Sequence, residues 1–159
     1  KLEIKNIDLI MNLQGDEPII NIEDIISLNE KMIYSQSKLG TLAANIKNNK
    51  DLKNKNIVKV ITKKKIFKDQ FIEAKTFLRS VSNLNNVYKH IGIYCFSKET
   101  LEKFVSLDQS KNEIENRLEQ LRALDNGIKI NVSLAKSSPI GIDTLEDYIA
   151  LKKYMEYKN

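Results

Sequence analysis

The sequence predicts a layered α/β fold built on a mostly parallel sheet. Segments with the apolar pattern of strands alternate along the chain with segments that have the 3.6-residue spacing of helices, and no internal repeat is detectable. The 159 residues, 42% of them hydrophobic, are enough for one substantial core but too few for two independent domains. We therefore expect residues 1–159 to form a single domain.

The first predicted strand is an almost continuous apolar run. It covers residues 8–13 and is ended by the turn-forming sequence Gln14–Pro18. Such a run is typical of a central strand that is buried on both faces. Asn21, followed three residues later by Asp24, then predicts the start of a helix. Apolar side chains follow at helical spacing: Ile22, Ile25, Ile26, Met32 and Ile33.

Two further strands are predicted on either side of a polar loop. Residues 41–46 and 57–62 have the composition of strands. The lysine- and asparagine-rich stretch 47–56 between them predicts a surface loop. Residues 63–86 fit no single element. Within them a partial helical spacing is seen at Phe67, Phe71, Ala74 and Leu78.

The second half of the chain predicts two strands and two helices. Residues 90–96 are rich in β-branched and aromatic residues, and Gly92 within this strand indicates a close backbone approach. A helix ending near Gly127 is predicted by apolar residues at intervals of four, three and three: Ile114, Leu118, Leu121 and Leu124. Residues 129–135 alternate as a strand. Thr144–Asp147 has the sequence of a capping box, which predicts a final helix.

The composition excludes several classes of function. The net charge of +5 comes from dispersed lysines, so nucleic-acid binding is not expected, although such a surface could attract an anionic substrate. No run of eighteen apolar residues predicts a membrane span. One histidine and one cysteine cannot supply a zinc site, so any metal must be held by oxygen. The lone Cys95, with no leader sequence, favours the cytoplasm.

Two carboxylates are candidates for such a metal site. Asp16 follows the first predicted strand, and Asp143 lies in the loop before the last helix. Both can therefore reach the carboxyl end of the sheet, where α/β proteins bind ligands. Two oxygen ligands, completed by substrate phosphates and water, suit Mg²⁺. The alternative is that both aspartates only satisfy the backbone of turns. The pattern alone leaves both interpretations open.

Four motifs, read in order, resemble those of the 3-deoxy-manno-octulosonate cytidylyltransferases. They are Asn12–Pro18 (NLQGDEP), His90–Tyr94 (HIGIY), Leu118–Arg122 (LEQLR) and Gly141–Thr144 (GIDT). Each motif is weak alone, but their joint order and spacing are specific and extend over nearly the whole chain. The resemblance implies a three-layer nucleotidyltransferase fold with a mixed, mostly parallel sheet, and a homodimer.

The resemblance also implies a function. Enzymes of this family transfer CMP from CTP to 3-deoxy-D-manno-octulosonate (KDO) for lipopolysaccharide biosynthesis, releasing pyrophosphate with the help of Mg²⁺. Carried over position by position, Asp16 and Asp143 would be the metal ligands and catalytic residues. The implied substrate-binding residues are Gln14, Arg79, His90, Tyr94, Glu119 and Gln120. The alternative for His90 is an ordinary packed side chain, and for the glutamate–glutamine pair a solvated helix surface.

Two departures limit this transfer. Where the family has Tyr-Phe-Ser-Arg followed by Ile-Pro, this chain has Thr76–Arg79 followed by Ser80–Ser82, so Arg79 alone is carried over, as a partner for the sugar carboxylate. The chain also begins shortly before the first motif. We therefore expect it to lack the family's N-terminal CTP-binding loop and to be inactive by itself. The alternatives are a cytidylyltransferase for a nine-carbon sialic acid and an inactive fragment.

Two geometric expectations follow from these assignments. Asp16 and Asp143 should lie at the same end of the sheet, close enough to share one Mg²⁺. The substrate-binding residues of the second and third motifs should border one pocket on that side: His90, Tyr94, Glu119 and Gln120. The leucines of the helix that carries the third motif should face the core.

Overall fold

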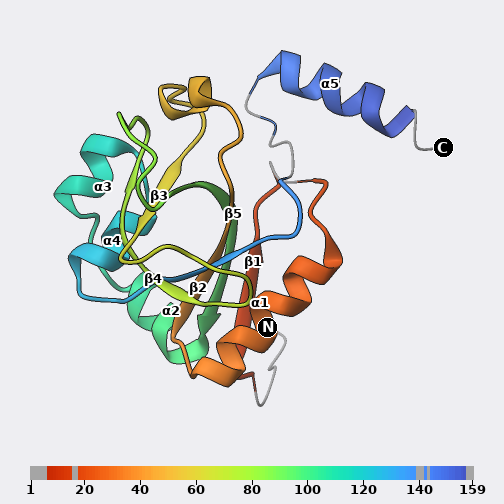
Figure 1. Ribbon diagram of the computed structural model, residues 1–159. Helices are drawn as coiled ribbons and strands as arrows, with labels where there is room; N and C mark the ends of the chain where they lie inside the picture. Colours follow the sequence, from red (N-terminus) through yellow and green to blue (C-terminus); the bar gives the residue numbers. More distant parts are fainter. Residues whose placement is uncertain (1–6, 16–17, 139–141, 143, 157–159) are drawn as a thin grey trace.

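The computed structural model describes residues 7–15, 18–138, 142 and 144–156 (Figure 1). Its strands are β1 (Leu9–Leu13), β2 (Leu39–Ala44), β3 (Lys59–Thr62), β4 (Ile72–Leu78), β5 (Val87–Ser97) and β6 (Asn131–Leu134). Its α-helices are α1 (Ile22–Ser35), α2 (Lys98–Val105), α3 (Lys111–Asn116), α4 (Gln120–Asp125) and α5 (Leu145–Glu156), and a 3-10 helix covers Asn49–Leu52. Among the described residues, no helix is both long and apolar enough to cross a bilayer.

The six strands form one mixed sheet in the order β1-β5-β2-β6-β4-β3. β3 also pairs with β5, so β5, β2, β6, β4 and β3 close into a ring. The length of β5 allows this closure. β2 pairs along one of its edges, while β3 and β1 pair with the beginning and the end of the strand. The predicted α/β fold with a mixed sheet is therefore confirmed, but the sheet is not a plain flat layer.

The prediction of a mostly parallel sheet is wrong for the described strands. Only β2 and β6 pair in parallel, whereas each of the other five pairings is antiparallel. A short connection explains one of the five antiparallel pairs, β3 with β4, whereas the other four join strands that are not consecutive in the chain. Strands joined by short segments, such as β3 and β4, turn back on one another, and a parallel pair needs a long crossover such as the one between β2 and β6.

The core has two parts, one on each face of β5, because successive side chains of a strand point to opposite faces. On one face, the side chains of Tyr88, Tyr94 and Phe96 pack with Phe104 of α2 and Leu121 of α4. On the other face, residues of β5 pack with α1: Ile91, Ile93, Cys95, Leu28 and Met32. Figure 1 shows α1 on one side of the sheet and α2, α3 and α4 on the other.

Helix α1 begins where the sequence predicts, but its buried face differs. The side chain of Asn21 accepts a hydrogen bond from the Glu23 backbone nitrogen at 2.9 Å. Ile22, Ile26 and Ile33 are nevertheless exposed. The face against the sheet carries Asp24, Leu28 and Met32 instead. Apolar residues occur on two sides of this helix, so their spacing predicts the helix without identifying the buried face.

Strand β1 is not the fully buried central strand that the apolar run predicts. Within the described residues it pairs with β5 alone and lies at an edge of the sheet. Its last residue, Leu13, is 52% exposed. The partial helical spacing in residues 63–86 is also misleading, because residues 72–78 form β4 between β3 and β6.

The helix predicted through residues 114–124 is two helices. A capping box at Ser110 starts α3, and Arg117 ends it with a left-handed backbone (φ 52°). A separate helix, α4, begins at Gln120 and ends before Gly127. The φ of 72° at Gly127 fits the predicted end of the helix. Leu118 and Leu121 are buried and Leu124 packs against the same core, as predicted. The capping box of α5 is also confirmed: Thr144 donates to Asp147 from its nitrogen and its hydroxyl.

Candidate substrate site

A cavity of about 190 Å³ brings together four of the six predicted substrate-binding residues. Gln14 reaches it from the end of β1, Tyr94 from β5, and Glu119 and Gln120 from the start of α4. These three segments are far apart in the sequence. The sequence analysis did not assign the rest of the lining to substrate binding: Asn12, which lies in the first motif, and Leu39, Phe96, Leu101, Phe104, Val105 and Ala123.

A bulge in β5 shapes the strand side of this site. The neighbouring β2 residues Thr41 and Leu42 pair with Tyr94 and Ile91, which leaves Gly92 and Ile93 as the two extra residues of the bulge. The side chain of Gln14 occupies the space that a side chain at position 92 would need. A Cβ atom on Gly92 would lie 2.4 Å from Gln14 Oε1. A group does approach Gly92 closely, but it is the side chain of Gln14 and not the backbone that the sequence predicts.

His90 lies next to this site rather than on the lining of the cavity. Its ring packs edge-on against Phe77, with the centroids 5.1 Å apart, and against Tyr94 at 5.4 Å. Its Nε2 atom is 3.0 Å from Thr41 Oγ1. Burial lowers the pKa of His90 to about 3, so the ring is uncharged at neutral pH. The structure joins His90 to the cavity through Tyr94, and its contact with substrate stays a prediction.

Tyr94 and Glu119 give the cavity a donor and an acceptor. Burial, and then the negative charge of Glu119, raise the pKa of the Tyr94 phenol well above its usual range. The phenol therefore remains protonated and able to donate a hydrogen bond. Glu119 is 63% exposed at its side chain, so its carboxylate stays accessible. Gln120 is largely buried and adds an amide.

An ion pair supports the helical side of the cavity. Arg122 donates from Nη2 and Nε to the two carboxylate oxygens of Glu113, at 2.6 and 2.8 Å. Its guanidinium also lies over the ring of Phe104, 4.9 Å from the centroid. Arg122 thus ties α4 to α3 and to the cavity-lining side of α2. The hydrogen bond from Arg122 is the main reason that the pKa of Glu113 is lowered.

The sequence analysis did not predict α2, the helix that carries the Phe104 ring beneath the Arg122 guanidinium. The helix is short, and its apolar residues are too few for a clear periodic pattern. A signal was nevertheless present at Ser97, which precedes the helix and whose hydroxyl accepts from the Thr100 nitrogen at 3.3 Å. Serine is a favoured N-cap residue. Together with Leu101 and Phe104 it could have predicted the helix and its buried face.

Arg79 is not placed with the other predicted site residues. It follows β4, and its guanidinium donates to three backbone carbonyl groups, those of Lys55, Asn116 and Arg117, at 2.9 to 3.1 Å. These bonds hold the turn between α3 and α4. Arg79 is absent from the lining of the cavity. Its proposed contact with a sugar carboxylate stays a prediction.

Asp16 and Asp143 lie outside the described residues, so their separation stays a prediction as well. Their described neighbours are informative about position. Gln14, two residues before Asp16, lines the cavity, and Thr144 directly after Asp143 begins the cap of α5. Within the described part of the chain, no group of three or more histidine, cysteine or acidic side chains could hold a metal ion.

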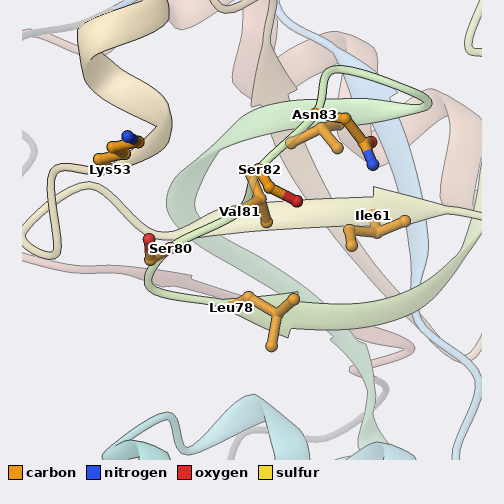
Figure 2. Close-up of a pocket in the computed structure, with 8 residues that line it drawn as sticks. Lys53, Ile61, Leu78, Ser80, Val81, Ser82 and Asn83 are labelled. Carbon is orange, nitrogen blue, oxygen red and sulfur yellow. The ribbon is translucent and has the colours of Figure 1, made fainter.

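A second, larger hollow of about 570 Å³ lies across β3 and the end of β4 (Figure 2). Ile61, Leu78 and Val87 supply apolar surface, and the chain after Arg79 covers its other side. That covering segment, 80–83, contains the sequence Ser80–Ser82 at which this chain departs from the family motif. None of the predicted site residues lines this hollow, so it is not a candidate for the same substrate.

The sequence comparison identifies the family. The sequence model of the family described as "Cytidylyltransferase" matches residues 1–130. The chain belongs to the cytidylyltransferase family. A relative from Thermodesulfovibrio yellowstonii, a 3-deoxy-manno-octulosonate cytidylyltransferase, is 42% identical over 151 residues, covering 91% of this chain and 59% of the relative. The enzyme of that name from Histophilus somni strain 2336 is 32% identical over 171 residues, covering 99% and 67%. The chain therefore spans 59 to 67% of these relatives' length.

Solved structures agree with this assignment. The structure of CMP:2-keto-3-deoxy-manno-octonic acid synthetase complexed with CTP matches with a TM-score of 0.81 and 27% identity, over 96% of this chain and 63% of that one. An apo UDP-glucose pyrophosphorylase matches with a TM-score of 0.66 and 14% identity, over 95% and 55%. The second match shows the fold alone. Both place the chain among nucleotidyltransferase-like folds, as the sequence predicts.

Proposed function

We propose that the protein is a 3-deoxy-manno-octulosonate cytidylyltransferase, which transfers CMP from CTP to KDO and releases pyrophosphate. The observation that carries this proposal is the convergence of Gln14, Tyr94, Glu119 and Gln120 on one cavity. The resemblance to the family had assigned these four residues to substrate binding. The relatives named above support the choice of substrates.

The cavity has the chemistry that a polyhydroxylated acid requires. Amide groups of Gln14 and Gln120 both donate and accept hydrogen bonds, the Glu119 carboxylate accepts from hydroxyl groups, and the protonated Tyr94 phenol donates. Apolar side chains from α2, those of Leu101, Phe104 and Val105, also line the cavity. Together these groups would hold the sugar acid with its reacting hydroxyl directed to the nucleotide, which lowers the entropic part of the barrier.

Asp16 and Asp143 complete the proposal as the residues that would hold Mg²⁺. Two carboxylates are suitable ligands, since Mg²⁺ prefers hard oxygen donors and keeps several sites for phosphate and water. The proximity of Asp16 in sequence to the cavity-lining Gln14 supports this position. When bound there, the ion would supply positive charge for the phosphate groups of CTP. The chain's own residues would bind and orient the sugar acid.

The test is pyrophosphate release by the full-length protein with CTP and Mg²⁺, across a panel of sugar acids. We expect KDO to be used with a kcat/KM at least roughly a hundredfold above that of a nine-carbon sialic acid, a difference of about 2.7 kcal/mol at the barrier. A preference for the nine-carbon acid would favour the sialic acid alternative. Release with neither acid would contradict the proposed function and favour an inactive fragment.

Assembly and location are further parts of the proposal. The resemblance leads us to expect a homodimer. The single cysteine leads us to expect a cytoplasmic location. Burial raises the pKa of the Cys95 thiol to about 11, so this cysteine is a packed thiol rather than a reactive one. Measurement of the molar mass in solution would test the dimer.

A further inference from the structure

Thr41 closes the bulge in β5 beside the candidate substrate site. Its side chain is fully buried, and its Oγ1 atom lies 2.6 Å from the Ile93 carbonyl oxygen and 3.3 Å from that of Ile91. These carbonyl groups flank Gly92, where the ladder between β2 and β5 is interrupted. The threonine hydroxyl therefore supplies a donor that the irregular strand lacks.

The same hydroxyl determines which nitrogen of His90 carries a proton. A threonine hydroxyl has one hydrogen, and a carbonyl oxygen can only accept, so this hydrogen is committed to the short bond with Ile93. His90 Nε2, 3.0 Å from Thr41 Oγ1, must then be the donor of that second bond. The neutral ring consequently carries its proton on Nε2 and a free lone pair on Nδ1.

The surroundings of His90 keep the ring in this state. Phe77 and Tyr94 pack against it, and no hydrogen bond to Nδ1 is found among the described residues. The desolvation that lowers the pKa of His90 keeps the ring uncharged at neutral pH. A neutral nitrogen with a lone pair accepts a hydrogen bond from a hydroxyl group but repels a carboxylate or phosphate oxygen.

We propose that Thr41 is a positioning residue that holds His90 in the Nε2–H tautomer, so that Nδ1 is an acceptor for a hydroxyl group of the bound sugar acid. The second half of this inference rests on the proposed function, whereas the first half concerns the free protein. The inference also specifies the expected substrate contact of His90, because Nδ1 would accept a hydrogen bond from a hydroxyl group and would repel the carboxylate.

The chain's single histidine makes the tautomer directly measurable. We would record long-range ¹H–¹⁵N spectra of the imidazole in the ligand-free chain at neutral pH, for the wild type and for Thr41→Val, Thr41→Ser and Thr62→Val. Thr62 is the matched control. It is also a buried strand threonine, and its hydroxyl donates to a backbone carbonyl, that of Lys64, at 2.6 Å. It makes no recorded contact with His90.

The expected result is a proton-bearing Nε2 and a bare Nδ1 in the wild type, Thr41→Ser and Thr62→Val. Thr41→Val removes the acceptor, so the Nδ1–H form should become populated to at least about half. A wild-type ring with its proton on Nδ1 would overturn the inference, and this measurement needs no variant to fold. A pure Nε2–H form in folded Thr41→Val would overturn the role of Thr41.

Adding KDO to the same sample tests the hydroxyl contact. Binding of the acid is followed by saturable chemical-shift changes of the Gln14 and Gln120 side-chain amides. If the acid binds, the chemical shift of His90 Nδ1 should change over the same range of KDO concentration. Saturable amide shifts with an unmoved Nδ1 resonance would overturn the hydroxyl assignment and leave the proposed function intact. No binding of KDO by the full-length protein in the presence of CTP and Mg²⁺ would count against the proposed function and the hydroxyl contact. The spectrum of the ligand-free chain tests the tautomer independently.

Discussion

At the scale of single residues, the position of the Gln14 side chain depends on the absence of a side chain at Gly92. Gly92 has no side chain, and the Gln14 amide fills the space beside it at the edge of the cavity. The atom that a new methyl group would meet is the far end of a flexible side chain. A substitution at Gly92 should therefore move the amide of Gln14 and leave the strand in place.

We predict that Gly92→Ala raises the KM for the sugar acid about tenfold, equivalent to about 1.4 kcal/mol, with little change in the KM for CTP. The unfolding free energy should change by less than about 1 kcal/mol, because the displaced group is a side-chain amide rather than backbone. Steady-state kinetics of the full-length protein and a denaturant titration measure the two effects.

Gln14→Ala is the matched control for this prediction. If Gly92→Ala acts by displacing Gln14, the double variant should be no worse than either single variant, since both changes remove the same contact. Effects on the sugar acid KM that add in the double variant would show that Gly92 acts in another way.

His90 should make stability depend on pH. Its pKa is about 3 in the folded protein, against 6.5 for an unperturbed histidine, so the unfolded chain binds more protons between these values. The free energy of unfolding is therefore highest above pH 6.5. It decreases as the pH falls towards about 3, the pKa of His90 in the folded protein. Between pH 6 and pH 4 the slope from this residue approaches about 1.4 kcal/mol per pH unit.

The check on this prediction is urea unfolding at several pH values for the wild type and for His90→Gln. Carboxylates contribute to both proteins, so the difference between the two curves isolates the histidine. The wild type should lose stability more steeply below pH 6.5. Parallel curves would mean that His90 is not desolvated in the folded protein.

Four polar residues of the candidate site, but neither its apolar lining nor its supports, could be predicted at this scale. Gln14, Tyr94, Glu119 and Gln120 were identified because the motifs that carry them are ordered along the chain, and the structure brings them together. Thr41 gives no such signal, since its role comes from a bulge in the neighbouring strand. A bulge depends on how two strands pair, which the pattern of either strand does not specify.

At the scale of the elements, Arg79 connects the end of β4 to the turn between α3 and α4. Three of its five N–H groups donate to backbone carbonyl groups, which indicates a structural role. We predict that Arg79→Met lowers the unfolding free energy by roughly 2 kcal/mol, since hydrogen bonds from a charged group are lost and carbonyls are left unpaired. The KM for the sugar acid should change less than about threefold.

Arg117→Met is the control, because Arg117 has an exposed side chain and keeps the same backbone strain in the variant. It should be nearly as stable as the wild type. A stable Arg79→Met protein with a strongly raised sugar acid KM would contradict the structural role and support the carboxylate contact that the family motif implies.

The elements themselves were predictable where a local signal is strong. The cap at Asn21 and the capping box at Thr144 both mark real helix starts, because these side chains satisfy the free backbone nitrogens directly. The apolar stripe through residues 114–124 was misleading, because Arg117 adopts a left-handed backbone that no side-chain pattern encodes. Strand β4 was missed although its partner β3 is near in sequence, because Phe67, Phe71, Ala74 and Leu78 have a partial helical spacing.

At the scale of the whole molecule, sheet direction was the main failure. The apolar run of β1 was interpreted as a central strand buried on both faces, but within the described residues β1 is an edge strand that pairs antiparallel with β5. Pairing direction depends on which strands become neighbours in the sheet, and the apolar pattern of a single strand does not specify its neighbours. Fold class was predictable because the alternation of strands and helices fixes the layers even when strand directions are wrong.

The metal site belongs to this scale because its two expected ligands are 127 residues apart, 143 against 16 in the sequence. We predict that Asp143→Asn lowers Mg²⁺-dependent pyrophosphate release by at least roughly a hundredfold, about 2.7 kcal/mol at the barrier. Asparagine still suits a turn, so the metal-free melting curve should hardly change. Turnover close to wild type at low Mg²⁺ would show that Asp143 is not a ligand.

The central claim is that the cavity between β5, α2 and α4 binds the sugar acid. The most direct measurement is the KM for KDO in Tyr94→Phe, with the KM for CTP determined in the same assay. The substitution keeps the ring beside His90 and Phe96 and removes one hydroxyl group from the lining of the cavity. We predict a rise in the KM for KDO of about tenfold or more, consistent with the loss of one hydrogen bond of about 1.4 kcal/mol, and an unchanged KM for CTP. An unchanged KM for KDO, in a protein that folds and turns over normally, would contradict the claim.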